Sequence, residues 1–304
     1  MKFDELLEKN NTNLNELAKV VGIPYTTLYS GVGNPSRLRA DNLKIIAGYF
    51  HISMEEMYDI MNEDKEKTLL NVFREQKGMR LSGSIYHETQ IKLCYNTNRI
   101  EGSMLSEDQT RYIYETNTVI EGDTPSRVDD IVETANHFKL FDIMLDKAKD
   151  MLTDSMIKEF HEVLKRGTSD ERKDWFIVGD YKTLPNEVGG KETTAPERVA
   201  EEMAKLLTWY NGRKEITLDE IIEFHYRFES IHPFQDGNGR VGRIIMFKEC
   251  LKHNIIPFVI EDTQKAFYYR GLKEYGQEKG YLRDTCLSMQ DKYKAVIEKF
   301  GVKL

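Results

Sequence analysis

Apolar side chains recur at helical spacing along most of this 304-residue chain. The pattern is clearest in residues 221–231 and 241–251, where apolar residues three or four positions apart line one face of a helix. Residues 175–194 have the one convincing strand pattern, with β-branched and aromatic residues around a Gly189-Gly190 turn. The sequence therefore predicts a mainly α protein that carries one small β-hairpin.

Composition narrows the class of protein. A hydrophobic content of 40% and a charged content of 31% are ordinary for a chain that folds in water. Charged residues interrupt every apolar stretch well before the roughly 18 residues that a membrane helix needs, and the first residues are too acidic for a secretion signal. We therefore expect a cytoplasmic protein without a membrane span. The three cysteines lie far apart, which favours reduced thiols.

The charged segment at residues 62–67 predicts a domain boundary between residues 1–62 and 63–304. In the first part, LAKVVGIPYTTLY reads as helix, tight turn and helix, and resembles the helix-turn-helix of Cro and CI-type repressors. Tyr25, Thr26, Thr27 and Tyr29 are candidate DNA contacts, with Arg37 and Arg39 as phosphate clamps. Residues 1–62 carry only six Lys and Arg against eight Asp and Glu, so a helical adaptor that binds no DNA stays open.

The segment IHPFQDGNGRVGR, residues 231–243, carries the candidate chemistry. Gly237, Gly239 and Gly242 fit the spacing of a dinucleotide fingerprint, but that motif requires a buried strand before it, and here an amphipathic helix precedes it. We therefore reject a dinucleotide-binding fold. A Gly-Asn-Gly loop that enters a helix still leaves backbone N–H groups free to bind an anion, which predicts a phosphate site.

The charged residues of this segment fit a polyphosphate. Arg240 and Arg243 lie three positions apart on one helix face and can bind further phosphate oxygens. Asp236 is a hard oxygen ligand suited to Mg²⁺, and His232 is a candidate general base because it titrates near neutrality. Each residue alone is more often structural, a turn former or a core side chain. Their occurrence together favours the functional interpretation.

HPFQDGNGRVGR matches the Fic family motif H-x-F-x-[DE]-G-N-G-R-x-x-R at every fixed position, and the resemblance extends over roughly residues 68–290. It implies a Fic-type helical core with a small β-hairpin flap, here preceded by a small helix-turn-helix domain. It also implies an enzyme that transfers AMP from ATP to a Ser, Thr or Tyr hydroxyl of a target protein or of itself. Partners would then be ATP and a target protein, with DNA as a further candidate for residues 1–62.

The resemblance also implies a role for each motif residue. His232 would deprotonate the target hydroxyl, Asp236 would hold Mg²⁺, and Phe234 would anchor the loop in the core. Phosphate ligands would be Gly237, Asn238 and Gly239 for the α-phosphate and Arg240 and Arg243 for the β- and γ-phosphates. The flap at Val188 and Gly189 would align the target segment, and Tyr268 and Tyr269 would lie near the adenine and ribose. Gly276 replaces an asparagine that is common in the family.

Upstream, residues 97–102 fit the family's inhibitory pattern [ST]-x-x-x-E-[GN], with Thr97 and Glu101 at its fixed positions. The resemblance implies an inhibitory helix near residues 90–102 whose Glu101 pairs with Arg243 and misaligns the γ-phosphate. Two alternatives stay open for Glu101: an ordinary surface salt bridge, or a role in positioning water to remove AMP from a modified target.

Two other functions stay open for the whole chain. Some Fic relatives transfer phosphate or phosphocholine, although Asp236 and Arg243 favour AMP transfer from ATP. A DNA-binding regulator whose Fic domain only senses nucleotide is the alternative from a different class. The sequence leaves open the target, the trigger and whether the chain forms a homodimer.

Overall fold

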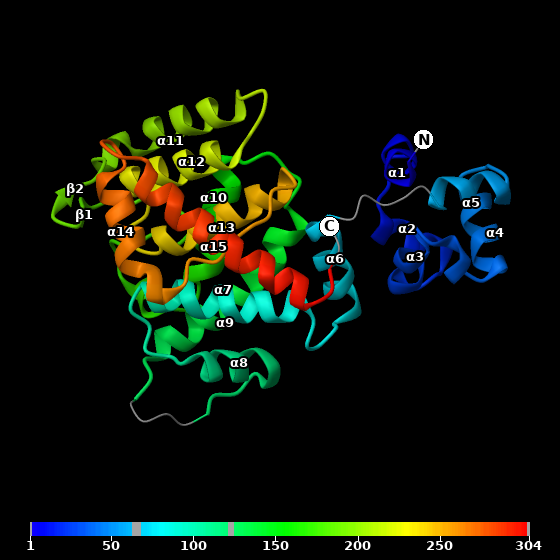
Figure 1. The fold of residues 1–304 in the computed structure, drawn as a ribbon, viewed down its shortest axis with the longest axis horizontal. Helices are drawn as coiled ribbons and strands as arrows, with labels where there is room; N and C mark the ends of the chain where they lie inside the picture. Colours follow the sequence, from blue (N-terminus) through cyan, green and yellow to red (C-terminus); the bar gives the residue numbers. More distant parts are fainter. Residues whose placement is uncertain (1, 63–67, 121–124, 303–304) are drawn as a thin grey trace. The chain divides into compact units, whose positions relative to one another are not determined.

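The computed structural model describes residues 2–62, 68–120 and 125–302. This part of the chain is mainly helical, with one antiparallel pair of short strands, so the predicted fold class is confirmed (Figure 1). It divides into two compact units, one ending at Ser82 and the other comprising Gly83–Val302.

The smaller unit has its own hydrophobic core. Fifteen buried apolar side chains from residues 3–61 pack together, among them Leu17, Leu28, Ile46 and Met57, which have no exposed surface. Its helices are α1 (Phe3–Lys9), α2 (Leu14–Val21), α3 (Tyr25–Gly31), α4 (Ala40–Tyr49), α5 (Met54–Asn62) and α6 (Leu69–Met79), with a 3₁₀ turn at Pro35–Arg37.

Helices α2 and α3 form the predicted helix, turn and helix. The side chain of Asn13 caps α2 by accepting a hydrogen bond from the Glu16 N–H, and Gly22 ends α2 in the left-handed conformation at φ 69°. Among the candidate DNA contacts, Thr26 is exposed, but Tyr29 is buried and its hydroxyl donates to the Asn71 carbonyl at 2.9 Å. The interpretation of Tyr29 as a DNA contact is therefore wrong, because this side chain holds α3 and α6 together.

Because of this contact, α6 belongs to the smaller unit, whereas the sequence-based division after residue 62 placed it in the larger part. Local charge could not indicate which unit α6 packs against. The charged residues 63–67 on which that division rests lie outside the described residues, and the assignment of functions to the two parts stays a prediction.

The larger unit is built around α13, whose residues 240–251 are all buried. Helices α7, α9, α10 and α12 pack directly on it, so its apolar residues and its charged residues Arg240, Arg243, Lys248 and Glu249 are buried alike (Figure 1). The elements of this unit are α7 (Ile85–Ile100), α8 (Glu107–Thr116), α9 (Val128–Asp146), α10 (Asp154–Lys165), β1 (Glu187–Val188), β2 (Lys191–Glu192), α11 (Pro196–Asn211), α12 (Leu218–Ile231), α13 (Asn238–Lys252), α14 (Lys265–Glu274) and α15 (Gly280–Lys299), with 3₁₀ turns at Ser169–Arg172 and Asp262–Gln264.

The hairpin is smaller than the predicted segment 175–194. Strands β1 and β2 have two residues each and pair antiparallel through Val188 and Lys191. Gly189 and Gly190 between them have φ values of 58° and 75°, as a two-residue turn with two left-handed positions requires. The rest of the predicted segment is irregular.

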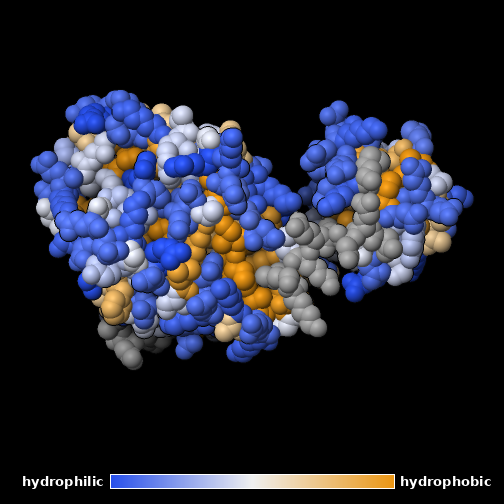
Figure 2. All heavy atoms as spheres, turned by 45° about the horizontal axis from the view of Figure 1, so that its top comes forward, coloured by the Kyte–Doolittle hydropathy of each residue, from blue (hydrophilic) through white to orange (hydrophobic). Residues whose placement is uncertain are grey.

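The visible face of each unit is a mosaic in which hydrophilic residues surround smaller hydrophobic areas (Figure 2). Within the described residues, each helix is too short or too polar to cross a lipid bilayer. Cys94, Cys250 and Cys286 are buried and unpaired, as the sequence predicts.

Candidate active site

The loop between α12 and α13 is held from inside the protein. Phe234 is fully buried, and its ring stacks on the His161 ring with 4.0 Å between centroids. The Asn238 side chain clamps the same residue, because its Oδ1 accepts from the Phe234 N–H and its Nδ2 donates to the Phe234 carbonyl, both at 2.8 Å. His232 ends α12 in the left-handed conformation at φ 51°, with its N–H bonded to the Phe228 carbonyl. These contacts fix the conformation of the loop between α12 and α13.

Asn238 was predicted to bind a phosphate with its neighbours Gly237 and Gly239. Both polar atoms of its side chain are instead bonded to Phe234, which leaves the backbone as the anion-binding group. The first hydrogen bond within α13 runs from the Val241 N–H to the Gly237 carbonyl, so the N–H groups of residues 238–240 precede it at the positive end of the helix. The phosphate site at this helix end stays a prediction.

The carboxylate of Glu101 lies at this helix end. Glu101 follows the last residue of α7, and a Cβ added at Gly239 would overlap its Oε1 atom. Any side chain other than hydrogen at position 239 would therefore displace Glu101. A carboxylate of this chain thus lies at the helix end where the sequence predicts a phosphate.

Arg243 is bound to α7 by three contacts. Its Nη2 donates to Glu101 Oε1 at 2.6 Å and to the Thr97 carbonyl at 3.1 Å, and its Nε donates to Thr97 Oγ1 at 2.6 Å. The Arg243 side chain is 3% exposed and that of Glu101 is 28% exposed. Burial, the largest single influence, would lower the pKa of Arg243, but nearby acidic groups, Glu101 foremost, together raise it above its usual value. The predicted Glu101–Arg243 pair is therefore present in the structure.

Asp236 and Arg240 belong to a buried network of charges. The Arg240 guanidinium pairs with Glu133, and its Nη2 lies 3.1 Å from Asp236 Oδ2. Lys165 Nζ lies 2.7 Å from the same oxygen of Asp236 and 2.6 Å from Glu133 Oε1. Burial would raise the pKa of Asp236, but Arg240 and Lys165 hold it well below its usual range. Asp236 is therefore ionised, and 52% of its side chain is exposed, so its carboxylate is accessible to a metal ion.

His232 lies in an environment that keeps it neutral. Burial, and next the nearby Lys182 ammonium, lower its pKa to about 4. Its Nδ1 is buried and has no hydrogen-bond partner within the described chain. A neutral imidazole can accept a proton at physiological pH, which fits the predicted role of general base.

The flap is tied to the His232 loop by side chains near its base. Lys182 Nζ donates to Asn186 Oδ1 at 2.7 Å and to Thr193 Oγ1 at 2.6 Å, and the Lys182 N–H donates to the Pro233 carbonyl at 2.8 Å. Asn186 Nδ2 also donates to the Phe234 carbonyl at 3.1 Å. The exposed hairpin, with Val188 in β1 and Gly189 in its turn, is therefore anchored at the loop that carries the candidate base.

Tyr268 and Tyr269, on α14, have different surroundings. Tyr268 is fully buried, and its hydroxyl lies 2.7 Å from His225 Nε2 and 3.5 Å from Arg243 Nη1. Tyr269 is 39% exposed. Of the two predicted nucleotide contacts, Tyr269 alone offers a ring surface in this structure, while Tyr268 supports Arg243 from inside.

Glu229, on α12, is a mostly buried acid of this region, with 13% of its side chain exposed. Its Oε1 has no hydrogen-bond partner among the described residues and lies 3.9 Å from His225 Nε2. Burial raises its pKa to about 8, so the carboxyl is mostly protonated at neutral pH. A Cβ at Gly242 would lie 2.7 Å from this oxygen, which explains the glycine at that position.

Comparison with known families identifies the domain that this geometry belongs to. The model of the Fic/DOC family matches residues 151–250, which include the flap and the whole His232–Arg243 segment. The chain contains a Fic domain. Glu101, Tyr268 and Tyr269 lie outside the matched residues.

Curated relatives of this Fic domain are named protein adenylyltransferases. Protein adenylyltransferase fic-1 of Caenorhabditis briggsae is 31% identical over 98 residues, which are 31% of this chain and 19% of that protein. The protein of the same name from Caenorhabditis elegans is 28% identical over 132 residues, 42% of this chain and 25% of that protein. Protein adenylyltransferase Fic of Drosophila melanogaster is 32% identical over 98 residues, 31% of this chain and 20% of that protein. The chain thus spans about a fifth to a quarter of these relatives.

Solved structures share the fold. A Fic domain containing signalling protein from Bacteroides thetaiotaomicron has a TM-score of 0.58 and 23% identity, covering 76% of this chain and 94% of that one. Fic-1 from Caenorhabditis elegans has a TM-score of 0.58 and 20% identity, covering 94% and 84%.

Several residues that support the site were not among those selected from the sequence: Glu133, His161, Lys165 and Asp170. One signal was present in the sequence. His161 and Lys165 lie four positions apart on the apolar face of α10, beside Ile157, Phe160 and Leu164. Polar residues on a buried helix face require partners in the core. The identity of those partners depends on packing between distant segments.

Proposed function

We propose that this chain is a protein adenylyltransferase, which transfers AMP from ATP to a Ser, Thr or Tyr hydroxyl of a target protein, and that Glu101 restrains it. The observation that carries the proposal is the position of the Glu101 carboxylate. It lies against Gly239 at the N-terminus of α13 and pairs with Arg243, while the neutral His232 ends the preceding helix. The names of the curated relatives support the same reaction.

The reaction requires a base, a phosphate cradle and a placed nucleophile. His232 accepts the proton of the target hydroxyl, whose oxygen attacks the α-phosphorus of ATP. The bond from that phosphorus to the oxygen bridging the α- and β-phosphates breaks, and pyrophosphate leaves. The N–H groups at the start of α13 stabilise negative charge on the α-phosphate, and Arg243 binds the terminal phosphates once Glu101 has moved away.

Asp236 is the residue that would hold Mg²⁺. It is ionised and half exposed, and Lys165 and Arg240 both contact its Oδ2, so neither cation engages Oδ1. When bound, Mg²⁺ neutralises phosphate charge.

Restraint by Glu101 follows from competition between two anions. The carboxylate and the terminal phosphates require the same Arg243 donors, which α7 now holds through Glu101 and Thr97. A buried arginine with a directional carboxylate partner is a strong contact. ATP can therefore bind productively only when Glu101 releases Arg243.

The flap supports a protein as the acceptor. Both strands are exposed along their length, and Lys182 and Asn186 anchor them at the His232 loop. An extended segment of the target can add to such an edge and bring one hydroxyl to the base.

The decisive experiment incubates the Glu101→Gly variant with Mg²⁺ and ATP labelled at either the α- or the γ-phosphorus. The proposal predicts protein-bound label from α-labelled ATP alone, on a Ser, Thr or Tyr, and none with the Glu101→Gly/His232→Gln double variant. Label from γ-labelled ATP would instead identify a phosphotransferase.

We propose DNA binding by residues 1–62 as a second function. The compact core of this region and the α2–α3 pair support it, with Thr26, Arg37 and Arg39 exposed. Fluorescence anisotropy with duplex DNA at rising salt is the test, and the proposal predicts binding that salt weakens. Absence of binding at low salt would leave the helical adaptor.

A further inference from the structure

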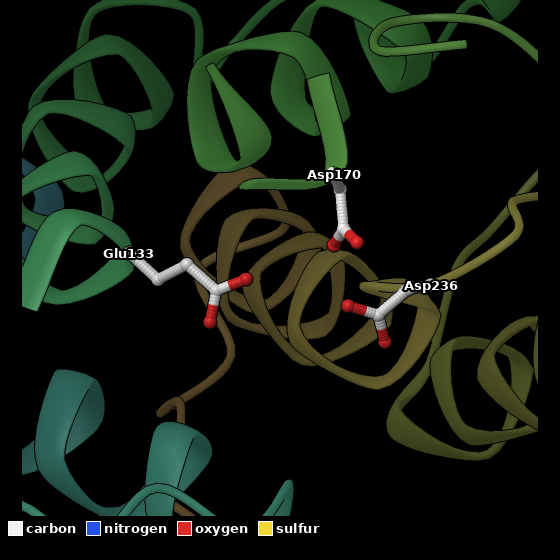
Figure 3. A group of neighbouring side chains, drawn as sticks. All are labelled: Glu133, Asp170 and Asp236. Atoms are coloured by element: carbon white, nitrogen blue, oxygen red, sulfur yellow. The ribbon is translucent and has the colours of Figure 1, made fainter. Parts of the chain in front are cut away.

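A buried lysine lies among three carboxylates of the Fic domain. Glu133 from α9, Asp170 from the turn Ser169–Arg172 and Asp236 from the loop before α13 point toward one another (Figure 3). Each offers an oxygen within 4.8 Å of the other two. Lys165, 2% exposed, places its Nζ 2.6 Å from Glu133 Oε1, 2.6 Å from Asp170 Oδ2 and 2.7 Å from Asp236 Oδ2.

This geometry resembles the first coordination sphere of a divalent ion. Protein oxygens bind Mg²⁺ at about 2.0–2.1 Å and Ca²⁺ at about 2.3–2.6 Å, so two ligands of one ion lie up to roughly 4–5 Å apart. The three carboxylates satisfy this limit. The ammonium group, however, already bonds all three, and a second cation at the same point would be repelled.

The network also explains the orientation of Asp236. Lys165 and Arg240 both contact Oδ2 of Asp236 and both contact Glu133, which closes a ring of alternating charges. Three members of this ring are nearly fully buried, so it cannot relax into solvent. The exposed carboxylate of Asp236 is therefore held through its Oδ2 atom by two buried cations, Lys165 and Arg240.

We propose that Lys165 is a positioning residue of the active site: its ammonium takes the place that a divalent cation would otherwise take among Glu133, Asp170 and Asp236, and holds Asp236 in place. Lys165 thus prevents the cluster from capturing the metal. The nucleotide's Mg²⁺ is left with Asp236 alone, a consequence that rests on the proposed function.

Removal of the ammonium should create a metal site. Without nucleotide, Lys165→Ala should bind one Mn²⁺ more per chain than the wild type in a calorimetric titration, and Mn²⁺ should raise its melting temperature. Lys165→Ala/Asp170→Asn should lose that site. Lys147→Ala is the matched control, because Lys147 pairs with Glu159 away from this cluster, and it should titrate like the wild type.

Two further readouts separate positioning from simple structural support. If Lys165→Ala unfolds because its carboxylates repel, Mn²⁺ should restore the folded state, and Lys165→Arg should fold without metal. In the Glu101→Gly background, Lys165→Ala should change the Mg²⁺ concentration that gives half-maximal AMP transfer by at least about tenfold, with partial recovery in Lys165→Arg.

A folded Lys165→Ala that binds no additional Mn²⁺ would overturn the proposal, and so would an unfolded Lys165→Ala that Mn²⁺ does not restore to the folded state. The Mn²⁺ titration uses no ATP and no target, so this failure is distinct from a failure of the proposed AMP transfer.

Discussion

The hydroxyl of Thr97 should contribute measurably to the proposed restraint of AMP transfer. It is buried and accepts a 2.6 Å hydrogen bond from Arg243 Nε, next to the Glu101 pair. Thr97→Val keeps the shape of the side chain but leaves a charged, buried donor without its partner. A hydrogen bond to a charged group contributes about 1.5–3 kcal/mol. In the proposed active state Arg243 binds ATP instead of Thr97, so loss of this hydrogen bond destabilises the restrained state alone.

A penalty of 1.4 kcal/mol changes a population about tenfold. Glu101 and the Thr97 carbonyl still bind Arg243 in the variant, so we take the lower limit of the hydrogen-bond energy, about 1.5 kcal/mol. We therefore expect roughly a tenfold increase in the initial rate of AMP incorporation. The ceiling is the rate of Glu101→Gly. The same lost hydrogen bond should lower the melting temperature of Thr97→Val by a few degrees.

The assay is the initial rate of protein labelling from α-labelled ATP at saturating ATP and Mg²⁺. Thr97→Ser is the matched control, because it keeps the hydroxyl, and it should behave like the wild type. A Thr97→Val rate equal to the wild-type rate, together with a faster Glu101→Gly, would refute the role of the hydroxyl. Equal acceleration in Thr97→Ser and Thr97→Val would assign the effect to packing.

Three further outcomes are expected. Because burial and Lys182 lower the pKa of His232 to about 4, the acid limb of the rate profile of Glu101→Gly should fall well below pH 6, and a limb near pH 6.5 would contradict the buried base. The Glu229 carboxyl has a pKa of about 8 when folded against an ordinary 4.5, so stability falls as pH rises between these values, by on the order of 3 kcal/mol at neutral pH. Chemical denaturation at pH 5 and pH 8 should show this loss in the wild type and much less of it in Glu229→Gln. Asn238→Ala removes both hydrogen bonds to Phe234, a loss of roughly 2–3 kcal/mol that should lower the melting temperature by roughly 5–10 °C in calorimetry, whereas an unchanged value would contradict the clamp.

The parts of the site that the sequence predicted are those encoded locally. Residues 231–243 combine a helix end, a glycine-rich loop and a helix start within one short stretch, which the local sequence pattern predicted, and the resemblance supplied the buried anchor Phe234. The left-handed conformation of His232 was not predicted. The contact between Glu101 and Arg243 joins distant segments, and it was predicted only because the resemblance supplied the pairing.

The remaining parts depend on packing that no local pattern encodes. Glu133 and Lys165 meet Asp236 because α9 and α10 both pack on α13, and the sequence does not indicate which faces of these helices meet. Tyr268 and Tyr269 are neighbours with different surroundings, since adjacent positions on a helix point about 100° apart. For Asn238, the sequence identified a polar residue at a helix start, but whether its side chain binds a ligand or its own loop depended on the conformation of the loop.

Restraint by Glu101 and proton transfer to His232 are tested together by the initial rate of AMP incorporation from α-labelled ATP in Glu101→Gly beside the wild type, with Glu101→Gly/His232→Gln as control. We expect a rate for Glu101→Gly at least roughly tenfold above the wild type, because the charged hydrogen bond to Arg243 is lost, and background labelling in the double variant. Equal labelling of Glu101→Gly and wild type would contradict restraint by Glu101, and undiminished labelling in the double variant would contradict His232 as the base.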